Sequence, residues 1–137
     1  MAAMKYAVVE GSGYHDQVYV VVDRKAIVQD AIRYLKPIHA DYDTIAVRGV
    51  SGLTVGSILA HMLQKHLIIV RKDGESSHGK PVEGVVNSRY IIVDDFEVSG
   101  NTVNVINEGA AKLRGTWVAT YMWRDRELTT VTGKVKK

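Results

Sequence analysis

The amino-acid sequence predicts a single three-layer α/β domain, in which helices cover both faces of a mostly parallel central sheet. Short runs of large apolar residues, typical of buried strands, alternate with segments whose apolar residues recur every three or four positions, as on one face of a helix. Two of the strand-like runs lead through glycine-containing loops into a helix-like segment. This alternation predicts a parallel sheet, because each helix carries the chain back to the edge where the next strand starts.

The first third of the chain is predicted to form a β-hairpin followed by a helix. Apolar, β-branched residues indicate two short strands at Lys5–Val9 and Val18–Val22, separated by a glycine-containing turn. A helix with an apolar stripe over residues 27–35 comes next. It is expected to stop before Pro37, because proline does not fit into a helix interior.

The rest of the chain contains the predicted core strands. A helix follows the first of them and another follows the third, where Gly115 marks the helix end. Between the second and third strands the sequence predicts a polar, glycine-spaced segment at 72–80 and a short edge strand at 82–86. The residues from 123 onward are predicted to form an irregular tail. The predicted core strands are Thr44–Arg48, Leu67–Arg71, Tyr90–Val93 and Trp117–Met122.

Composition excludes several classes of protein. The chain has 137 residues, 46% of them hydrophobic and 24% charged, as in an ordinary globular domain with its own core. It contains no cysteine, which excludes disulfides, thiolate metal sites and a cysteine nucleophile. No apolar run approaches the length of a membrane span and no signal-peptide core is present, so we expect a cytoplasmic protein. The net charge of +3 suits an anionic small substrate. The sequence lacks the interleaving of basic and aromatic residues that is expected of a nucleic-acid-binding surface.

The stretch from Tyr90 to Thr102 is suited to bind a phosphorylated sugar. Asp94 and Asp95 follow the strand at its carboxyl end, where α/β sheets bind ligands, and can accept from sugar hydroxyls directly or through Mg²⁺. A small polar loop and a helix start follow, and the unpaired N–H groups of a helix start bind phosphate. On the residues alone, an acidic pair that caps a turn and a plain helix cap at Ser99 or Asn101 explain the pattern equally well.

Two further loops are candidates for the same ligand-binding site. The loop at 48–52 joins the first core strand to its helix, and tight packing of helix on strand is the simpler explanation of its glycines. The segment from Arg71 to Lys80 carries cations and His78, although its composition alone favours a solvated loop. Because the 48–52 loop and the acidic pair both follow carboxyl ends of strands, we expect them to lie together.

The segment Ile-Ile-Val-Asp-Asp-Phe-Glu-Val-Ser-Gly-Asn-Thr resembles the phosphoribosyl pyrophosphate (PRPP) motif of type I phosphoribosyltransferases, and the resemblance covers about residues 44–124. It implies their fold, with a core at about 40–124 and a small hood formed by the N-terminal hairpin and the C-terminal tail. It also implies transfer of a 5-phosphoribosyl group from PRPP to a nucleobase, Mg²⁺ as cofactor, and a homodimer. From composition we expect no membrane partner and no nucleic-acid partner.

The resemblance implies a role for each matching residue. The 5′-phosphate is expected at Val98, Ser99, Gly100, Asn101 and Thr102, and the ribose and Mg²⁺ at Asp94 and Asp95. The pyrophosphate is expected at Arg48, Gly49, Val50, Ser51, Gly52, Arg71 and Lys72. The catalytic residues are expected to be Lys72, His78 and Asp95, and the residue that stacks on the base to be Trp123. The family also leads us to expect a non-proline cis peptide within Val47–Val50.

Two alternatives stay open. Val98 stands where hypoxanthine–guanine and xanthine enzymes have an aspartate. A valine there is compatible with orotate or adenine enzymes, so the base stays open between orotate and a purine. The chain also resembles PRPP-binding regulatory proteins that lost transfer activity, some of which bind nucleic acid. The intact Arg71-Lys72 pair favours the enzyme, whereas the basic tail slightly favours the regulator.

Overall fold

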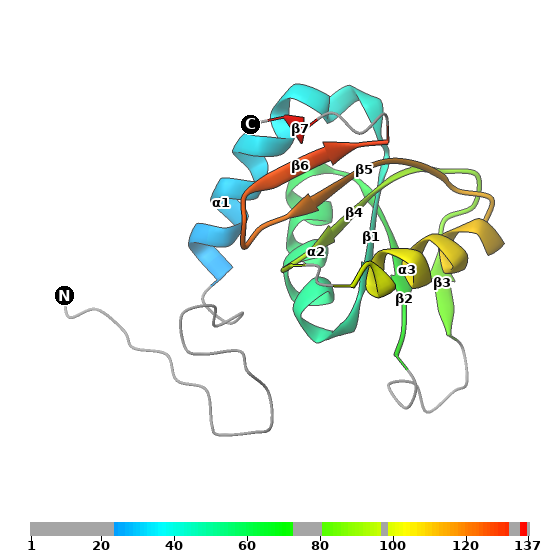
Figure 1. Ribbon diagram of the computed structural model, residues 1–137. Coiled ribbons are helices and arrows are strands. Elements are labelled where there is room, and N and C mark those ends of the chain that lie inside the picture. The colour runs from blue at the N-terminus through cyan, green and yellow to red at the C-terminus, as the bar shows by residue number, and fades with distance from the viewer. Residues whose placement is uncertain (1–23, 73–80, 97–98, 132–134, 137) are drawn as a thin grey trace, which may run out of the picture.

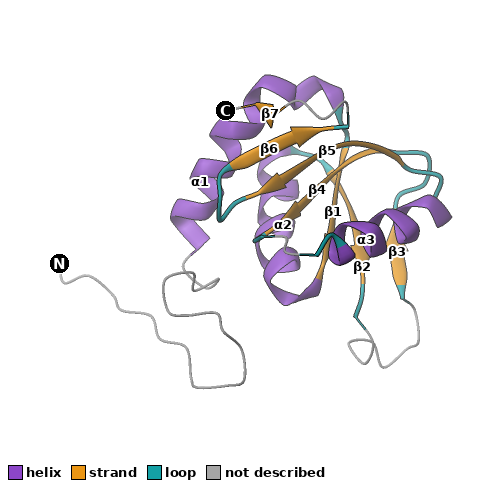
Figure 2. Cartoon of the chain, viewed as in Figure 1, coloured by secondary structure: helices purple, strands orange, loops and turns teal. Residues whose placement is uncertain are grey.

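The computed structural model describes residues 24–72, 81–96, 99–131 and 135–136. The expected N-terminal hairpin, His78 and Val98 lie outside these ranges. The described chain forms three layers, with α1 and α2 on one face of a twisted sheet and α3 on the other (Figure 1, Figure 2). The expected α/β architecture is therefore confirmed.

Seven strands of the described chain form the sheet, in the order β3-β2-β1-β4-β5-β6-β7. The four central strands are parallel, as the sequence predicts: β2 (His66–Val70), β1 (Thr44–Arg48), β4 (Arg89–Asp94) and β5 (Thr116–Met122). Antiparallel strands extend both edges, namely β3 (Val82–Gly84) beside β2, and β6 (Glu127–Thr130) and β7 (Val135–Lys136) beyond β5.

Three α-helices connect and cover these strands. They are α1 (Arg24–Leu35), α2 (Gly49–Leu63) and α3 (Asn101–Lys112), with a 3₁₀ helix at Lys36–Asp41 after α1. Pro37 lies in the first turn of that 3₁₀ helix, where its missing N–H is not needed. The chain leaves α2 through Gln64 in the left-handed conformation, a common way to end a helix.

Strand residues alternate between two hydrophobic clusters. Ile45 and Val47 of β1 pack with α1 and α2 on one face, whereas Ala46 packs with α3 on the other. All three are fully buried, so β1 is the centre of the molecule. The helices lie close to the sheet at glycines: a side chain at Gly56 would overlap with Val47, and one at Gly109 would meet Val70 at 2.7 Å.

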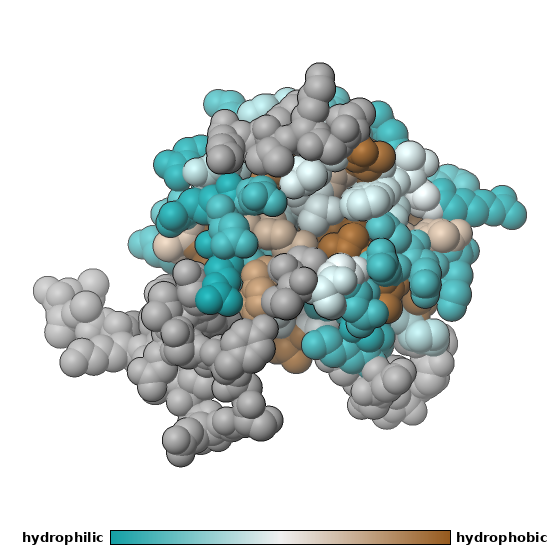
Figure 3. All heavy atoms as spheres, viewed as in Figure 1, coloured by the Kyte–Doolittle hydropathy of each residue, from teal (hydrophilic) through white to brown (hydrophobic). Residues whose placement is uncertain are grey.

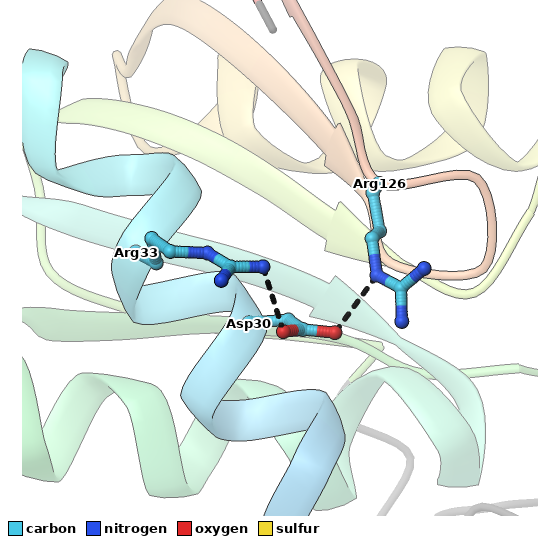
Figure 4. Close-up of polar contacts among 3 residues, drawn as sticks. All are labelled: Asp30, Arg33 and Arg126. Atoms are coloured by element: carbon cyan, nitrogen blue, oxygen red, sulfur yellow. Dashed lines mark hydrogen bonds and ion pairs between the residues drawn. The ribbon is translucent and has the colours of Figure 1, made fainter.

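The C-terminal segment corrects the sequence prediction. Instead of an irregular tail, residues 127–130 form β6, which pairs with β5 and buries Leu128 completely. One buried residue in a short polar segment gives no periodic signal, which is why the strand was not predicted. Asp30 of α1 also holds the turn before β6, accepting from Arg126 at 2.8 Å and from Arg33 at 3.1 Å (Figure 4).

The face of the described surface seen in Figure 3 is mostly hydrophilic, with hydrophobic side chains in small patches. Within the part of the chain that the structure describes, no helix is both long and apolar enough to cross a membrane. The large apolar side chains that are most exposed are Val50, Leu53, Met62, Val86, Trp117 and Val131.

Candidate functional site

The acidic pair lies at the carboxyl end of β4 and is held there by the chain after β5. The N–H of Trp123 donates to the carbonyl of Asp94, and the N–H of Arg124 donates to the carbonyl of Asp95, both at 3.0 Å. The Asp94 side chain is buried, with 5% exposed, and Asp95 is half-buried. In each, Oδ1 accepts from the next backbone N–H, at 2.9 Å from Asp95 and 2.7 Å from Phe96. These bonds orient both carboxylates at the sheet edge.

The amino end of α2 lies directly beside this acidic pair. A side-chain carbon at Gly52 would be 3.7 Å from Oδ1 of Asp94 and 3.5 Å from the carbonyl oxygen of Val93. The two are neighbours because β1 and β4 pair in parallel, so both strands end at the same edge. The expected meeting of the two loops at one edge is thus observed.

The stretch from Gly49 to Gly52 is not a separate loop but the first turn of α2. Gly49 has φ +78°, a left-handed conformation that turns the chain from strand into helix at once. All peptide bonds of the described residues are trans, so the expected cis bond within Val47–Val50 is wrong. The turn that a cis bond would supply comes instead from the glycine. The first N–H groups of α2 are left without partners in the helix and suit an anion.

Two cations flank the amino end of α2. Arg48 directly precedes the helix, and its buried Nε has no hydrogen-bond partner among the described residues. An orphaned buried donor of this kind favours an anionic ligand. Lys72 approaches from the end of β2: its Cε and Nζ are 3.0 and 3.2 Å from the position that a side-chain carbon would occupy at Gly49. The structure therefore brings Lys72 to the same helix end.

Arg71 is placed differently from Lys72. Its guanidinium forms an ion pair with Glu83 of β3, and its N–H donates to the carbonyl of Pro81 at 2.8 Å. The Arg71 side chain thus links the end of β2 to β3. Its predicted contact with pyrophosphate stays a prediction.

Gly100 caps the start of α3. It has φ +79°, and apart from its chain neighbours no heavy atom of the described residues lies within 4 Å of the position of a side-chain carbon there. Oγ of Ser99 accepts from the N–H of Asn101 at 3.3 Å. Ser99 and Asn101 are exposed and Thr102 is half-buried. The start of α3 thus offers open space beside backbone N–H groups and hydroxyls, as a phosphate site needs.

Several solved structures are similar to this chain in fold. An adenine phosphoribosyltransferase from Thermoanaerobacter pseudethanolicus matches with a TM-score of 0.61 at 21% identity, over 80% of this chain and 74% of that chain. An orotate phosphoribosyltransferase from Mycobacterium tuberculosis matches with a TM-score of 0.55 at 19% identity, over 74% and 60%. UMP synthase from Leishmania donovani matches with a TM-score of 0.61 at 21% identity, over 87% of this chain and 28% of that one.

No protein-family model matches the sequence, and no curated protein does. The likeness at these identities is one of fold. The chain has the type I phosphoribosyltransferase fold.

Within this phosphoribosyltransferase fold, the acidic pair is the only part of the described site whose chemistry suits Mg²⁺. Carboxylate oxygens are the ligands that Mg²⁺ prefers. The described residues hold no group of three or more His, Asp or Glu side chains that would bind a metal by themselves. Asp94 and Asp95 therefore fit Mg²⁺ where a substrate or water supplies the remaining oxygens.

Trp123, predicted to stack on a base, lies in the hydrophobic core with only 6% of its surface exposed. Its ring packs with the cluster under α1 and α2, and the stacking role stays a prediction. The neighbouring Arg124 was not among the predicted site residues; its guanidinium carbon is 4.6 Å from the ring centre of Phe96. An aromatic residue directly after an acidic pair, and a cation after the last core strand, are the signals that could have indicated this contact.

Proposed function

We propose that the protein is a phosphoribosyltransferase that transfers the 5-phosphoribosyl group of PRPP to a ring nitrogen of a nucleobase and releases pyrophosphate. The observation that carries the proposal is the meeting of three features at one sheet edge: the acidic pair, the amino end of α2 and the Lys72 ammonium group. The solved structures with this fold include adenine, orotate and purine phosphoribosyltransferases, which supports the same class.

PRPP has three polar parts, and each has a matching group at the site. The N–H groups and hydroxyls at 99–102 bind the 5′-phosphate at the start of α3. Asp94 and Asp95 accept from the ribose hydroxyls, oriented by the backbone bonds described above. The amino end of α2, together with Arg48 and Lys72, binds the pyrophosphate.

Transfer requires stabilisation of a departing pyrophosphate. Carbon 1 of the ribose develops oxocarbenium character as its bond to the pyrophosphate breaks, while negative charge accumulates on the leaving oxygens. The α2 N–H groups are fixed donors for that charge, and Lys72 adds a positive charge beside them. Mg²⁺, held by Asp94 and Asp95 through water or ribose hydroxyls, would neutralise further charge on the phosphate oxygens.

The principal test is PRPP binding by a double mutant of the acidic pair. Asp94→Asn with Asp95→Asn should abolish PRPP binding measured by calorimetry in the presence of Mg²⁺, because both ribose contacts and the metal site are lost. A matched control removes two exposed carboxylates elsewhere, Asp41→Asn with Glu108→Gln, and should bind as the wild type does. Full binding by a folded Asp94/Asp95 mutant would rule out the assignment.

Transfer itself is tested by incubating the protein with PRPP, Mg²⁺ and one base at a time, while pyrophosphate release is followed. Orotate, adenine, hypoxanthine and guanine are the bases to compare, since both orotate and a purine agree with the proposal. A protein that binds PRPP but consumes none of these bases would support the regulatory alternative instead.

A further inference from the structure

The ion pair between Arg71 and Glu83 crosses from the end of β2 to the edge strand β3. Val70 pairs with Val82 and Ile69 with Glu83, and the N–H of Arg71 continues the ladder to Pro81. Arg71 lies two residues beyond Ile69, so its side chain and that of Glu83 point to the same face of the sheet. The pairing thus follows from the register of the two strands.

This pair lies beside the proposed pyrophosphate site. Ile69 packs against the cluster under α1 and α2, so Arg71 and Glu83 are on the face that α2 covers. Lys72, the next residue, already contacts the amino end of α2 at Gly49. Glu83 therefore places a carboxylate close to a site that we propose binds an anion.

The exposure of the two partners indicates how firmly they hold each other. The side chain of Glu83 is 52% exposed and that of Arg71 is 24% exposed. Ion pairs in contact with water contribute little net free energy, so this one is readily exchanged for a stronger partner. Pyrophosphate is such a partner, because it carries several negative charges and matches the planar guanidinium with two oxygens at once.

We propose that Glu83 competes with pyrophosphate for Arg71, so that Arg71 exchanges its carboxylate partner for the pyrophosphate group when PRPP binds. This inference rests on the proposed function. In it, Glu83 is a positioning residue that holds Arg71 beside the site in the ligand-free protein and receives it again when pyrophosphate leaves. The carboxylate lowers the affinity for both PRPP and pyrophosphate, and it shortens the lifetime of the product complex.

The test is a double-mutant cycle on Glu83 and Arg71, with inorganic pyrophosphate and PRPP as probes in calorimetry at fixed ionic strength and Mg²⁺ concentration. Glu83→Gln keeps the shape of the side chain and removes its charge. It should tighten pyrophosphate binding by about twofold to fivefold, the range that corresponds to the loss of one exposed ion pair. In an Arg71→Ala background, Glu83→Gln should change the pyrophosphate affinity by less than about 1.5-fold, because the guanidinium for which Glu83 and pyrophosphate compete is gone.

A matched control separates this exchange from a general change in charge. Asp41→Asn removes one exposed carboxylate just before the amino end of β1, at the opposite edge of the sheet, and should leave pyrophosphate affinity unchanged. The proposal is overturned if Glu83→Gln leaves the affinity unchanged or weakens it, or if it tightens binding equally in the Arg71→Ala background. If the wild-type protein binds neither PRPP nor pyrophosphate, the proposed function is overturned as well. If it binds both, the proposed function stands whatever the effect of Glu83→Gln.

Discussion

Gly49 and Gly100 provide a direct test of how this chain turns into α2 and α3. Their φ angles are +78° and +79°, so an alanine at either position meets the same backbone strain. Their surroundings differ: a side-chain carbon at Gly49 would lie 3.0 Å from Cε of Lys72, whereas one at Gly100 would meet no atom of the described residues within 4 Å, its chain neighbours apart. The two substitutions therefore separate backbone strain from steric contact.

The expected cost is about the same for both. A residue with a side chain in the left-handed conformation costs roughly 1–2 kcal/mol relative to glycine. Gly49→Ala adds a close contact, but only with the far end of a flexible lysine that is exposed to solvent and moves aside. We therefore expect Gly49→Ala and Gly100→Ala each to lower the free energy of unfolding by about 1–2 kcal/mol, and to differ by less than about 0.5 kcal/mol.

Urea unfolding measures both values. With a denaturant slope of about 2 kcal/mol/M, each midpoint should fall by roughly 0.5–1 M. Lys72→Ala serves as the control background, in which the cost of Gly49→Ala should stay the same. The reasoning is refuted if Gly100→Ala is as stable as the wild type. It is also refuted if Gly49→Ala costs several kcal/mol more than Gly100→Ala and Lys72→Ala removes the excess.

Four further predictions concern packing, pH, catalysis and assembly. Gly56→Ala should destabilise the protein by about 1–3 kcal/mol in urea unfolding, because its new methyl overlaps with the buried Val47, and Val47→Ala should relieve much of this cost. Burial raises the pKa of Tyr42 to about 12, so the unfolded state, with its tyrosine pKa near 10, loses its proton first. Stability should therefore fall between pH 10 and 12, by up to roughly 3 kcal/mol from this group, and Tyr42→Phe should make that fall measurably shallower in unfolding curves. Lys72→Ala should lower kcat by roughly tenfold to thousandfold but PRPP affinity by less, because the charge of Lys72 matters most as pyrophosphate departs. Equal losses in kcat and PRPP affinity would mean that Lys72 only binds the substrate in its ground state. Sedimentation should show a homodimer at micromolar concentration, and an active monomer would contradict this.

The sequence by itself determined the buried strands and the location of the acidic pair. Thr44–Arg48 is a strand with the predicted bounds, and Asp94 ends β4 where the apolar run from Tyr90 stops. Both are local properties: a strand buried on both faces needs a continuous apolar run, and its end is marked where polar residues begin. The position of the two loops at one edge also follows from the alternation of strands and helices, because parallel strands have their carboxyl ends at the same edge; the direct pairing of β1 with β4 was not predicted.

The tertiary structure decided which groups lie beside one another at and around that edge. Glu83 is the partner of Arg71 because β2 and β3 pair in one register, and a shift of one residue would send the side chain to the other face. Arg126 reaches Asp30 across 96 positions of the sequence, and β6 pairs with the edge of β5. Contacts of this kind depend on where distant segments meet, and no local pattern of apolar and polar residues carries that information.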